Sequence, residues 1–451
     1  MPLHRNLFRP QVLSGLLAVP FVWLLSSPTW ADDSCVLPDS WFTSGIPDPQ
    51  ETAATTDFDS FCAFHVWSWN AFLWSMEEEG DALRFEGFPT QEQTIDASFG
   101  NKAAPKMLTL QPRAAKADHP IDSAAQAGTL GLLVAQNNRG VYYSQHITPQ
   151  MYDQVVSLDW NSAEGLIKAP DTALFDVGNI EYKAAWAIVD DSFTVPGAYT
   201  RQALIPELAT VVIDGVPTIR VPTDPVYVEA QVALIGFHVV GWVKGHSEAI
   251  WASFSPIGIA PVVPTDSKGI PTIKPSDPVS ATSTPFYAAN TTLADCNQTN
   301  LPVQSLNDGT QEFSIVTQVC QSYEAGTIGG YTTDNGMAIQ QVNASALNEI
   351  PDDNIAKGYF EVGAVWSNAD APGVSKLNST FQDALVGSNV LSNPVIETFT
   401  QTEVGQHNCL SCHNSLQFQP SDPKIPPLHA SMLNLSHFLM QIYVDTYDAS
   451  K

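Results

Sequence analysis

The chain has 451 residues, with 19 Lys or Arg against 47 Asp or Glu, so its formal net charge at pH 7 is −28. Such a surface argues against binding to nucleic acid or anionic lipid. It could attract a basic partner protein or a cationic substrate, although solubility alone is the simpler explanation of the charge. Charged residues make up only 15% of the chain, so uncharged polar residues must cover much of the surface, as is common in secreted β-rich proteins.

Residues 1–31 have the pattern of a secretory signal peptide. Arg5 and Arg9 precede an apolar stretch, and Thr29-Trp30-Ala31 places small residues at the −3 and −1 positions of a cleavage site. The alternative is an uncleaved anchor helix, although the apolar stretch is short for a membrane span. No later stretch reaches transmembrane length. We therefore expect a bacterial periplasmic or extracellular protein without a membrane span after cleavage.

An aromatic helix is expected at Phe61–Trp74, with Asp59 or Ser60 as its N-cap. Its aromatic residues fit a buried core helix, which we favour, or a wall beside a ligand. In the second interpretation His65 is a candidate metal ligand.

Strands are expected in the middle of the chain, where apolar and polar residues alternate or where short apolar runs occur. The expected strand segments are 129–146, 208–222, Ile180–Trp186, Val228–Val243, Ile250–Phe254 and Phe360–Trp366. Ile180–Trp186 and Phe360–Trp366 match at Glu181 with Glu361, which indicates either a weak internal duplication or coincidence. His238, inside the longest apolar run, is a core residue or a metal ligand.

Residues 255–312 form a long excursion rich in Pro, Ser, Thr and Asn. Setting aside Cys409 and Cys412, four cysteines remain, and four permit three pairings. We favour Cys35–Cys62 and Cys296–Cys320, because each pair is local in sequence and an exported protein experiences an oxidising compartment. Free buried thiols are the alternative.

The C-terminal part is expected to be mainly helical. Helical pieces are expected at Ser379–Val386, with Gly387 as its stop, and at Val395–Phe399. Prolines from Pro420 to Pro427 favour an extended path. A last helix is expected from Leu435 to Thr446, with Asn434 or Ser436 as its cap.

Between these pieces lies Cys409-Leu410-Ser411-Cys412-His413, a Cys-x-x-Cys-His motif. Two cysteines one helical turn apart can add to the two vinyl groups of one porphyrin, and the following histidine can bind the iron as proximal ligand. The motif therefore predicts one covalent haem c. The alternatives are a disulfide-exchange site, a zinc site and a structural disulfide. We expect no βαβ unit for the first, and for the second no further Cys/His pair follows the motif.

The sixth ligand of the iron would decide the chemistry, and the sequence leaves it open. His437 and Met432 are the favoured candidates: Met432 precedes the last expected helix, the order in which small cytochromes present their methionine, and His437 lies in the first turn of that helix. The other candidates are His429, His407, His65 and His238.

The motif lies too near the C-terminus for a stand-alone cytochrome domain, so upstream residues must help to enclose the haem. We predict an α+β protein with a β-rich body at 32–375, peripheral helices, and a small helical haem-binding segment at 376–451 docked on the body.

The arrangement resembles that of a group of uncharacterised bacterial secreted mono-haem c-type cytochrome-like proteins. The resemblance covers the aromatic segment at 61–74, His238 with Trp251-Ala-Ser-Phe254, and the motif at 409–413. Only the haem motif is specific. The resemblance implies haem binding and electron transfer, and it carries over no catalytic residue.

Two classes of function follow. An electron carrier needs a six-coordinate iron and a docking face, which the acidic surface could offer to a basic redox partner. A haem enzyme (a peroxidase or the electron-accepting part of a dehydrogenase) or a haem-based sensor needs an open distal position. We favour the electron carrier, because no acid/base constellation is recognisable, although the large body favours an enzyme. The substrate, the redox potential and the oligomeric state do not follow from the sequence.

Overall fold

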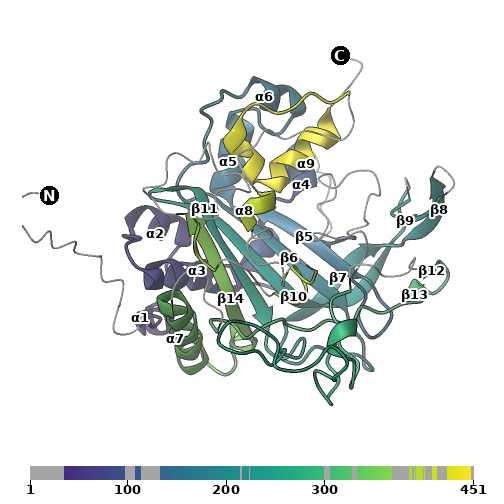
Figure 1. Ribbon diagram of the computed structural model, residues 1–451. Helices are drawn as coiled ribbons and strands as arrows, with labels where there is room; N and C mark the ends of the chain where they lie inside the picture. The colour runs from purple at the N-terminus through teal and green to yellow at the C-terminus, as the bar shows by residue number, and fades with distance from the viewer. Residues whose placement is uncertain are drawn as a thin grey trace, which may run out of the picture.

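The computed structural model describes residues 35–96, 107–112, 133–213, 216–222, 224–298, 305–327, 333–367, 385–388, 391, 393–399, 401, 409–413 and 424–447. The expected signal peptide and the prolines at 420 and 423 lie outside these residues. In the described residues the protein is a mixed α+β protein with a β-rich body and a C-terminal helix, as the sequence predicts (Figure 1).

The body is built on one sheet, which has nine strands among the described residues. Its main order is β15-β14-β11-β10-β6-β5-β4, while β7 pairs with β10 and β3 pairs with β7. Only the β3–β7 pair in this sheet is parallel. The strands are β3 (Leu108–Thr109), β4 (Gln111–Pro112), β5 (Val141–Ile147), β6 (Ile180–Ile188), β7 (Thr200–Pro206), β10 (Tyr227–Val243), β11 (His246–Pro256), β14 (Tyr359–Ser367) and β15 (Leu385–Gly387).

Among the residues that the structure describes, three two-stranded hairpins stand apart from this sheet. They are formed by β1 (Glu78–Glu79) with β2 (Ala82–Leu83), β8 (Ala209–Ile213) with β9 (Val216–Arg220), and β12 (Leu306–Asn307) with β13 (Glu312–Phe313).

The long apolar run predicted as one or two strands is a single strand, β10. Its first half pairs with β7 and its second half with β11, while β6 lies along its other edge. A bulge between Leu234 and Gly236 shifts the alternation of its side chains by one residue. Because of this shift, Leu234 and Phe237 share one face, while Ile235 and His238 point to the other.

The first face of the sheet is covered by α1, α2, α3 and α7, which lie together at the left in Figure 1. Their bounds are α1 (Ser40–Ser44), α2 (Pro49–Thr55), α3 (Phe61–Ser75) and α7 (Thr333–Glu349). Helix α3 begins at the N-cap Ser60 and is apolar around its circumference, so it is buried on all sides, as a core helix should be. A Cβ added at Gly241 would lie 2.1 Å from Cη2 of Trp67, so α3 can approach β10 this closely only beside glycine.

The second face carries the remaining helices, which gather at one end of the sheet (Figure 1). They are α4 (Gln91–Ile95), α5 (Pro149–Ser157), α6 (Ala163–Lys168), α8 (Cys409–Cys412) and α9 (His437–Thr446). Helix α9 packs against α4 and α6, so this helical cover combines chain segments from both ends of the sequence. In the described part of the chain, short 3-10 turns lie at η1 (Arg84–Gly87), η2 (Leu293–Asp295), η3 (Ile355–Gly358) and η6 (Ser431–Leu435).

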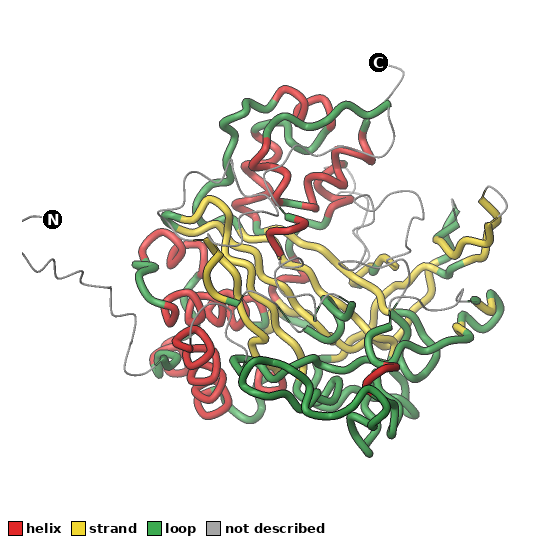
Figure 2. The backbone as a smooth tube through the Cα atoms, in the orientation of Figure 1, coloured by secondary structure: helices red, strands yellow, loops and turns green. Residues whose placement is uncertain are grey.

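The excursion after β11 is largely loop, as Figure 2 shows. Its Cys296 is joined to Cys320, and near the N-terminus Cys35 is joined to Cys62. Both predicted pairings are therefore confirmed. The second bridge closes the end of the excursion beside Val263 and Tyr287, which gives this loop a small core of its own.

The helical pieces predicted at Ser379–Val386 and Val395–Phe399 are wrong where the structure describes them. Leu385–Gly387 is the edge strand β15, paired with Val365–Ser367 of β14. Residues 394–399 are turns, in which Asn393 Oδ1 accepts the backbone N–H groups of Val395 and Ile396. Tertiary pairing and a side-chain turn thus override a weak helical pattern. Helix α7 was not expected from the sequence at all.

Candidate functional site

The Cys-x-x-Cys-His motif forms a single helical turn on the second face of the sheet. Cys409–Cys412 is helix α8, and the backbone N–H of His413 continues it by donating to the carbonyl of Cys409 at 2.8 Å. Residues four apart lie on the same side of a helix, so Cys409 and His413 share one side of this turn. Leu410 is buried in the core of the helical cover and anchors the turn there.

The His413 imidazole is held by a carbonyl from a later part of the chain. Its Nδ1 lies 2.8 Å from the backbone oxygen of Leu435, at the end of η6. Because a carbonyl can only accept, Nδ1 must carry the proton, and the lone pair of a neutral ring then lies on Nε2. Burial, followed by the neighbouring His437, lowers the pKa of His413 well below its usual value. Both effects favour the neutral imidazole with its lone pair on Nε2, and a carbonyl partner on the other ring nitrogen is typical of metal-ligating histidines.

Two aromatic rings pack against His413. The indole of Trp251 lies 4.3 Å from it between ring centroids, and the imidazole of His437 stacks on it at 3.6 Å with an interplanar angle of 27°. The indole N–H of Trp251 donates to the carbonyl of Glu248 at 2.8 Å, which fixes the orientation of the ring.

Trp251 belongs to a row of residues in register across five strands, which we call the Trp251 row. It consists of Ile147, Glu181, Val240, Trp251 and Val365. Glu181 is the one carboxylate in this otherwise apolar row. It lies buried beneath the start of α9, where its Oε2 accepts a hydrogen bond from the Ser436 hydroxyl at 2.8 Å. Burial raises the pKa of Glu181 to about 7, against the opposing effect of that hydrogen bond.

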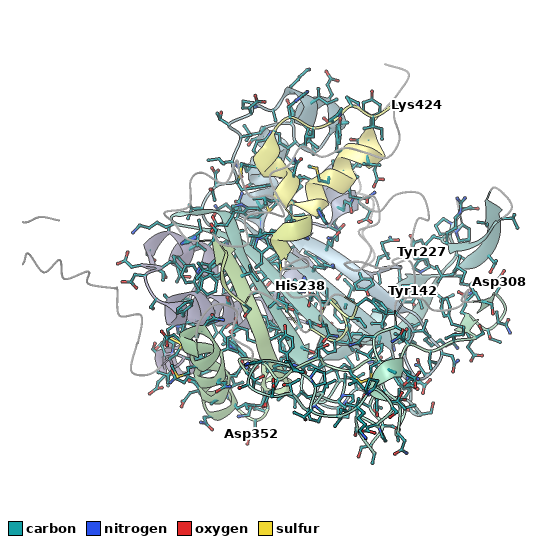
Figure 3. The ribbon with its side chains drawn as sticks, in the orientation of Figure 1. Tyr142, Tyr227, His238, Asp308, Asp352 and Lys424 are labelled. Carbon is teal, nitrogen blue, oxygen red and sulfur yellow. A yellow bond between two sulfur atoms is a disulfide. The ribbon has the colours of Figure 1, made fainter. Side chains whose placement is uncertain are left out.

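The next row on the same face is polar. Gln145, Lys183, His238 and Ser253 are in register across β5, β6, β10 and β11. His238 lies over the sheet near α8 (Figure 3), and its Nε2 is 2.5 Å from Oε1 of Glu397. Lys183 and His238 both lower the pKa of His413 through their electrostatic effect, so this row lies close to the motif.

The candidate distal ligands lie in different places. His437 is the first residue of α9 and stacks face to face on His413. If His413 and His437 were both to bind one iron, the His437 ring would have to leave this stack. Met432 is buried in the core of the helical cover, in η6. Both remain predictions.

The other histidines are distributed over the molecule. His65 is fully buried on the first face, where Nδ1 contacts Glu361 at 2.7 Å and Nε2 contacts Asn335 at 2.9 Å, so the sheet separates it from His413. His238 shares the face of His413, and His429 is exposed. His407 lies outside the described residues.

The sequence indicated the motif but missed some of its neighbours. Nothing in the sequence marks Glu397 as part of a site, because it lies in a segment predicted to be helical. The sequence distinguishes Glu181 only by its match to Glu361. The alternation of Glu181 and Lys183 along one strand could have placed both on the same face, but the identity of that face depends on long-range packing.

Other features of the described residues do not add to this site. No helix among them is long and apolar enough to cross a membrane, and they contain no group of three or more His, Cys, Asp or Glu side chains arranged for a metal ion. A cavity of about 270 Å³ lies between the end of α5 and α6, where Trp160 and Lys168 belong to its lining. None of the residues of the motif or of the two rows lines this cavity.

Comparison of the chain with protein-family models, with curated proteins and with solved structures finds no match.

Proposed function

We propose that the protein is an exported mono-haem c-type cytochrome that transfers electrons. The observation that carries the proposal is the motif itself: one helical turn bears Cys409 and Cys412, and the following His413 has its Nδ1 committed to the Leu435 carbonyl. When bound, haem c supplies a one-electron iron couple.

The residues present fit that group. Cys409 and Cys412 would hold the porphyrin by thioether bonds, and Nε2 of His413 would bind the iron. Trp251 and Val240 are apolar residues of the sheet beside the motif, and Lys183 in the next row would bring a positive charge near the haem propionates. Two disulfides fit an oxidising compartment outside the cytoplasm.

The partner is proposed from charge. With 47 acidic and 19 basic residues, the protein attracts a basic redox partner at long range, and the rate of association should fall as salt is added.

One observation favours a second function. His437 is stacked flat on His413, and an iron bound by His413 with no opposing side chain would have an open sixth position. That arrangement suits a haem enzyme of the peroxidase or dehydrogenase type, or a haem-based sensor.

Absorption spectra of protein exported through an intact cytochrome-maturation system test both proposals. We expect a haem that remains on the chain after denaturation, and a reduced protein that does not bind carbon monoxide readily. Replacing both Cys409 and Cys412 by Ala should abolish the bound haem, whereas the matched Cys296→Ala/Cys320→Ala protein should keep it. A colourless wild-type protein with the mass of the bare polypeptide contradicts haem binding. Rapid carbonyl formation favours the enzyme or the sensor.

A further inference from the structure

The position of His413 depends on a carbonyl that lies at a structural junction. Leu435 ends η6, and Ser436 is the N-cap of α9, where its hydroxyl accepts the backbone N–H of Leu439 at 3.2 Å. The oxygen that accepts from Nδ1 of His413 therefore belongs to the residue just before a helix cap. If this junction moves, the acceptor of the His413 proton moves with it.

The junction is tied to the centre of the sheet by Glu181. Its Oε2 accepts the hydroxyl proton of Ser436 at 2.8 Å, and the backbone N–H of Phe438 in the first turn of α9 also stabilises the carboxylate. A buried carboxylate at a helix N-terminus satisfies N–H groups that lack partners within the helix and is attracted by the helix dipole. The sheet thus caps the helix from below.

Glu181 is itself held firmly. It lies in β6, with Ile147 of β5 in register on one side and Val240 of β10 on the other. Its side chain is 5% exposed, as the fully covered Ser436 closes over it. A group on a central strand moves less than a loop, so it can transmit a fixed position to the helix start.

We propose that Glu181 is a positioning residue for the iron ligand, acting through Ser436 and the Leu435 carbonyl on Nδ1 of His413. The inference rests on the proposed function, since it assigns His413 to the iron. A firm Nδ1–H···O=C bond makes the imidazole a stronger donor and favours the oxidised iron. Removing Glu181 should therefore shift the equilibrium toward the reduced state.

The test compares the reduction potentials of the purified haem proteins. Glu181→Ala should raise the reduction equilibrium constant about tenfold, which is about 59 mV for a one-electron couple. Glu181→Gln keeps an oxygen that can accept from Ser436, so it should shift the constant less. Glu361→Gln is the matched control, because Glu361 is an equally buried glutamate on the opposite face; its potential should stay at the wild-type value. A Glu181→Ala protein with wild-type potential and spectrum overturns the inference.

If Glu181→Ala does not fold, Ser436→Ala decides the question. It removes the link while leaving the strand intact, so it should shift the potential in the same direction, and an unchanged potential refutes the inference. If the wild-type protein carries no haem, the proposed function fails. The inference then rests on the ring ¹⁵N shifts of His413: losing the Nδ1–H tautomer on Glu181→Ala supports it, and keeping it contradicts it.

Discussion

The two faces of the sheet each bury a glutamate, and they use it in different ways. On the first face Glu361 pairs with His65, and the pair is sealed beside Trp366, whose ring stacks on Phe64 at 4.0 Å between centroids. Burial alone would lower the pKa of His65, but Glu361 more than offsets this, so the pKa is raised. On the second face Glu181 meets a hydroxyl and a helix terminus. On the first face the glutamate pairs with a histidine inside the core. On the second face it binds the start of the helix that follows the carbonyl partner of His413.

The same comparison bears on the sequence similarity of Ile180–Trp186 and Phe360–Trp366. Both segments are strands of one sheet, and Trp186 and Trp366 both lie in the core of the first face. The glutamates nevertheless point to opposite faces, because a register shift in the β11–β14 pair lies between Ser253 and Phe254. The two segments therefore share their strand structure and the face of their tryptophans, but not the face of their glutamates.

The largest effect should come from breaking the sealed pair of the first face. Glu361→Ala leaves the His65 imidazole buried without its carboxylate, and removing one partner of a buried pair costs about 3–5 kcal/mol. Urea unfolding measures the loss. The exposed ion pair of Glu79 with Arg84 is the control, where Glu79→Gln should cost at most about 1 kcal/mol. Equal losses in the two variants would mean that the buried pair carries no special weight.

Measurements of stability against pH should reveal the raised pKa of Glu181, the glutamate of the second face. The folded-state pKa of Glu181 is about 7, above its ordinary value, so the protonated carboxyl favours the folded state. This contribution is complete below about pH 4.5 and is lost as the pH rises through 7, for a total of about 3 kcal/mol. The unfolding free energy of the wild type minus that of Glu181→Gln should fall across this window. Parallel curves would show that Glu181 titrates normally.

Two glycines on β10 test how tightly the two faces of the sheet are covered. A Cβ at Gly241 meets the rigid indole of Trp67 at 2.1 Å, whereas one at Gly236 meets Val395 at 2.8 Å and Ile396 at 2.9 Å in a turn segment. Overpacking a core costs about 1–3 kcal/mol. The loss of stability should therefore lie at the upper end of this range for Gly241→Ala and at the lower end for Gly236→Ala. Thermal unfolding measures both losses. A larger loss for Gly236→Ala than for Gly241→Ala would show that the second face is packed more rigidly than the first.

The smallest effect concerns the two serine caps. Ser60 caps α3 through the backbone N–H of Ala63, and Ser436 caps α9. Losing a serine cap costs about 1 kcal/mol, so Ser60→Ala should lose that much. Ser436→Ala should lose more, because it also removes the buried hydrogen bond that Ser436 donates to Glu181. Equal losses would show that the Glu181 link adds no stability.

Local patterns predicted the parts of the fold that local forces decide. The apolar circumference of α3, the run of β10, the serine caps and both disulfides followed from neighbouring residues. The motif at 409–413 was likewise complete in itself. Strand β15 could not be predicted, because Leu385–Gly387 extends only through its pairing with β14. The same holds for the partners of His413: the face on which Trp251 and Glu181 lie depends on bulges and on packing across the sheet.

The Glu181–Ser436 bond joins residues 255 positions apart, and this spacing has a consequence for biogenesis. Glu181 in the sheet is synthesised long before the Leu435 carbonyl that completes the environment of His413. A chain that stops short of Leu435 would carry the Cys-x-x-Cys-His motif and the described strands of the sheet, yet would lack the acceptor for the His413 proton. The hydrogen bond that orients His413 can therefore form only after the turn that precedes α9 has been synthesised.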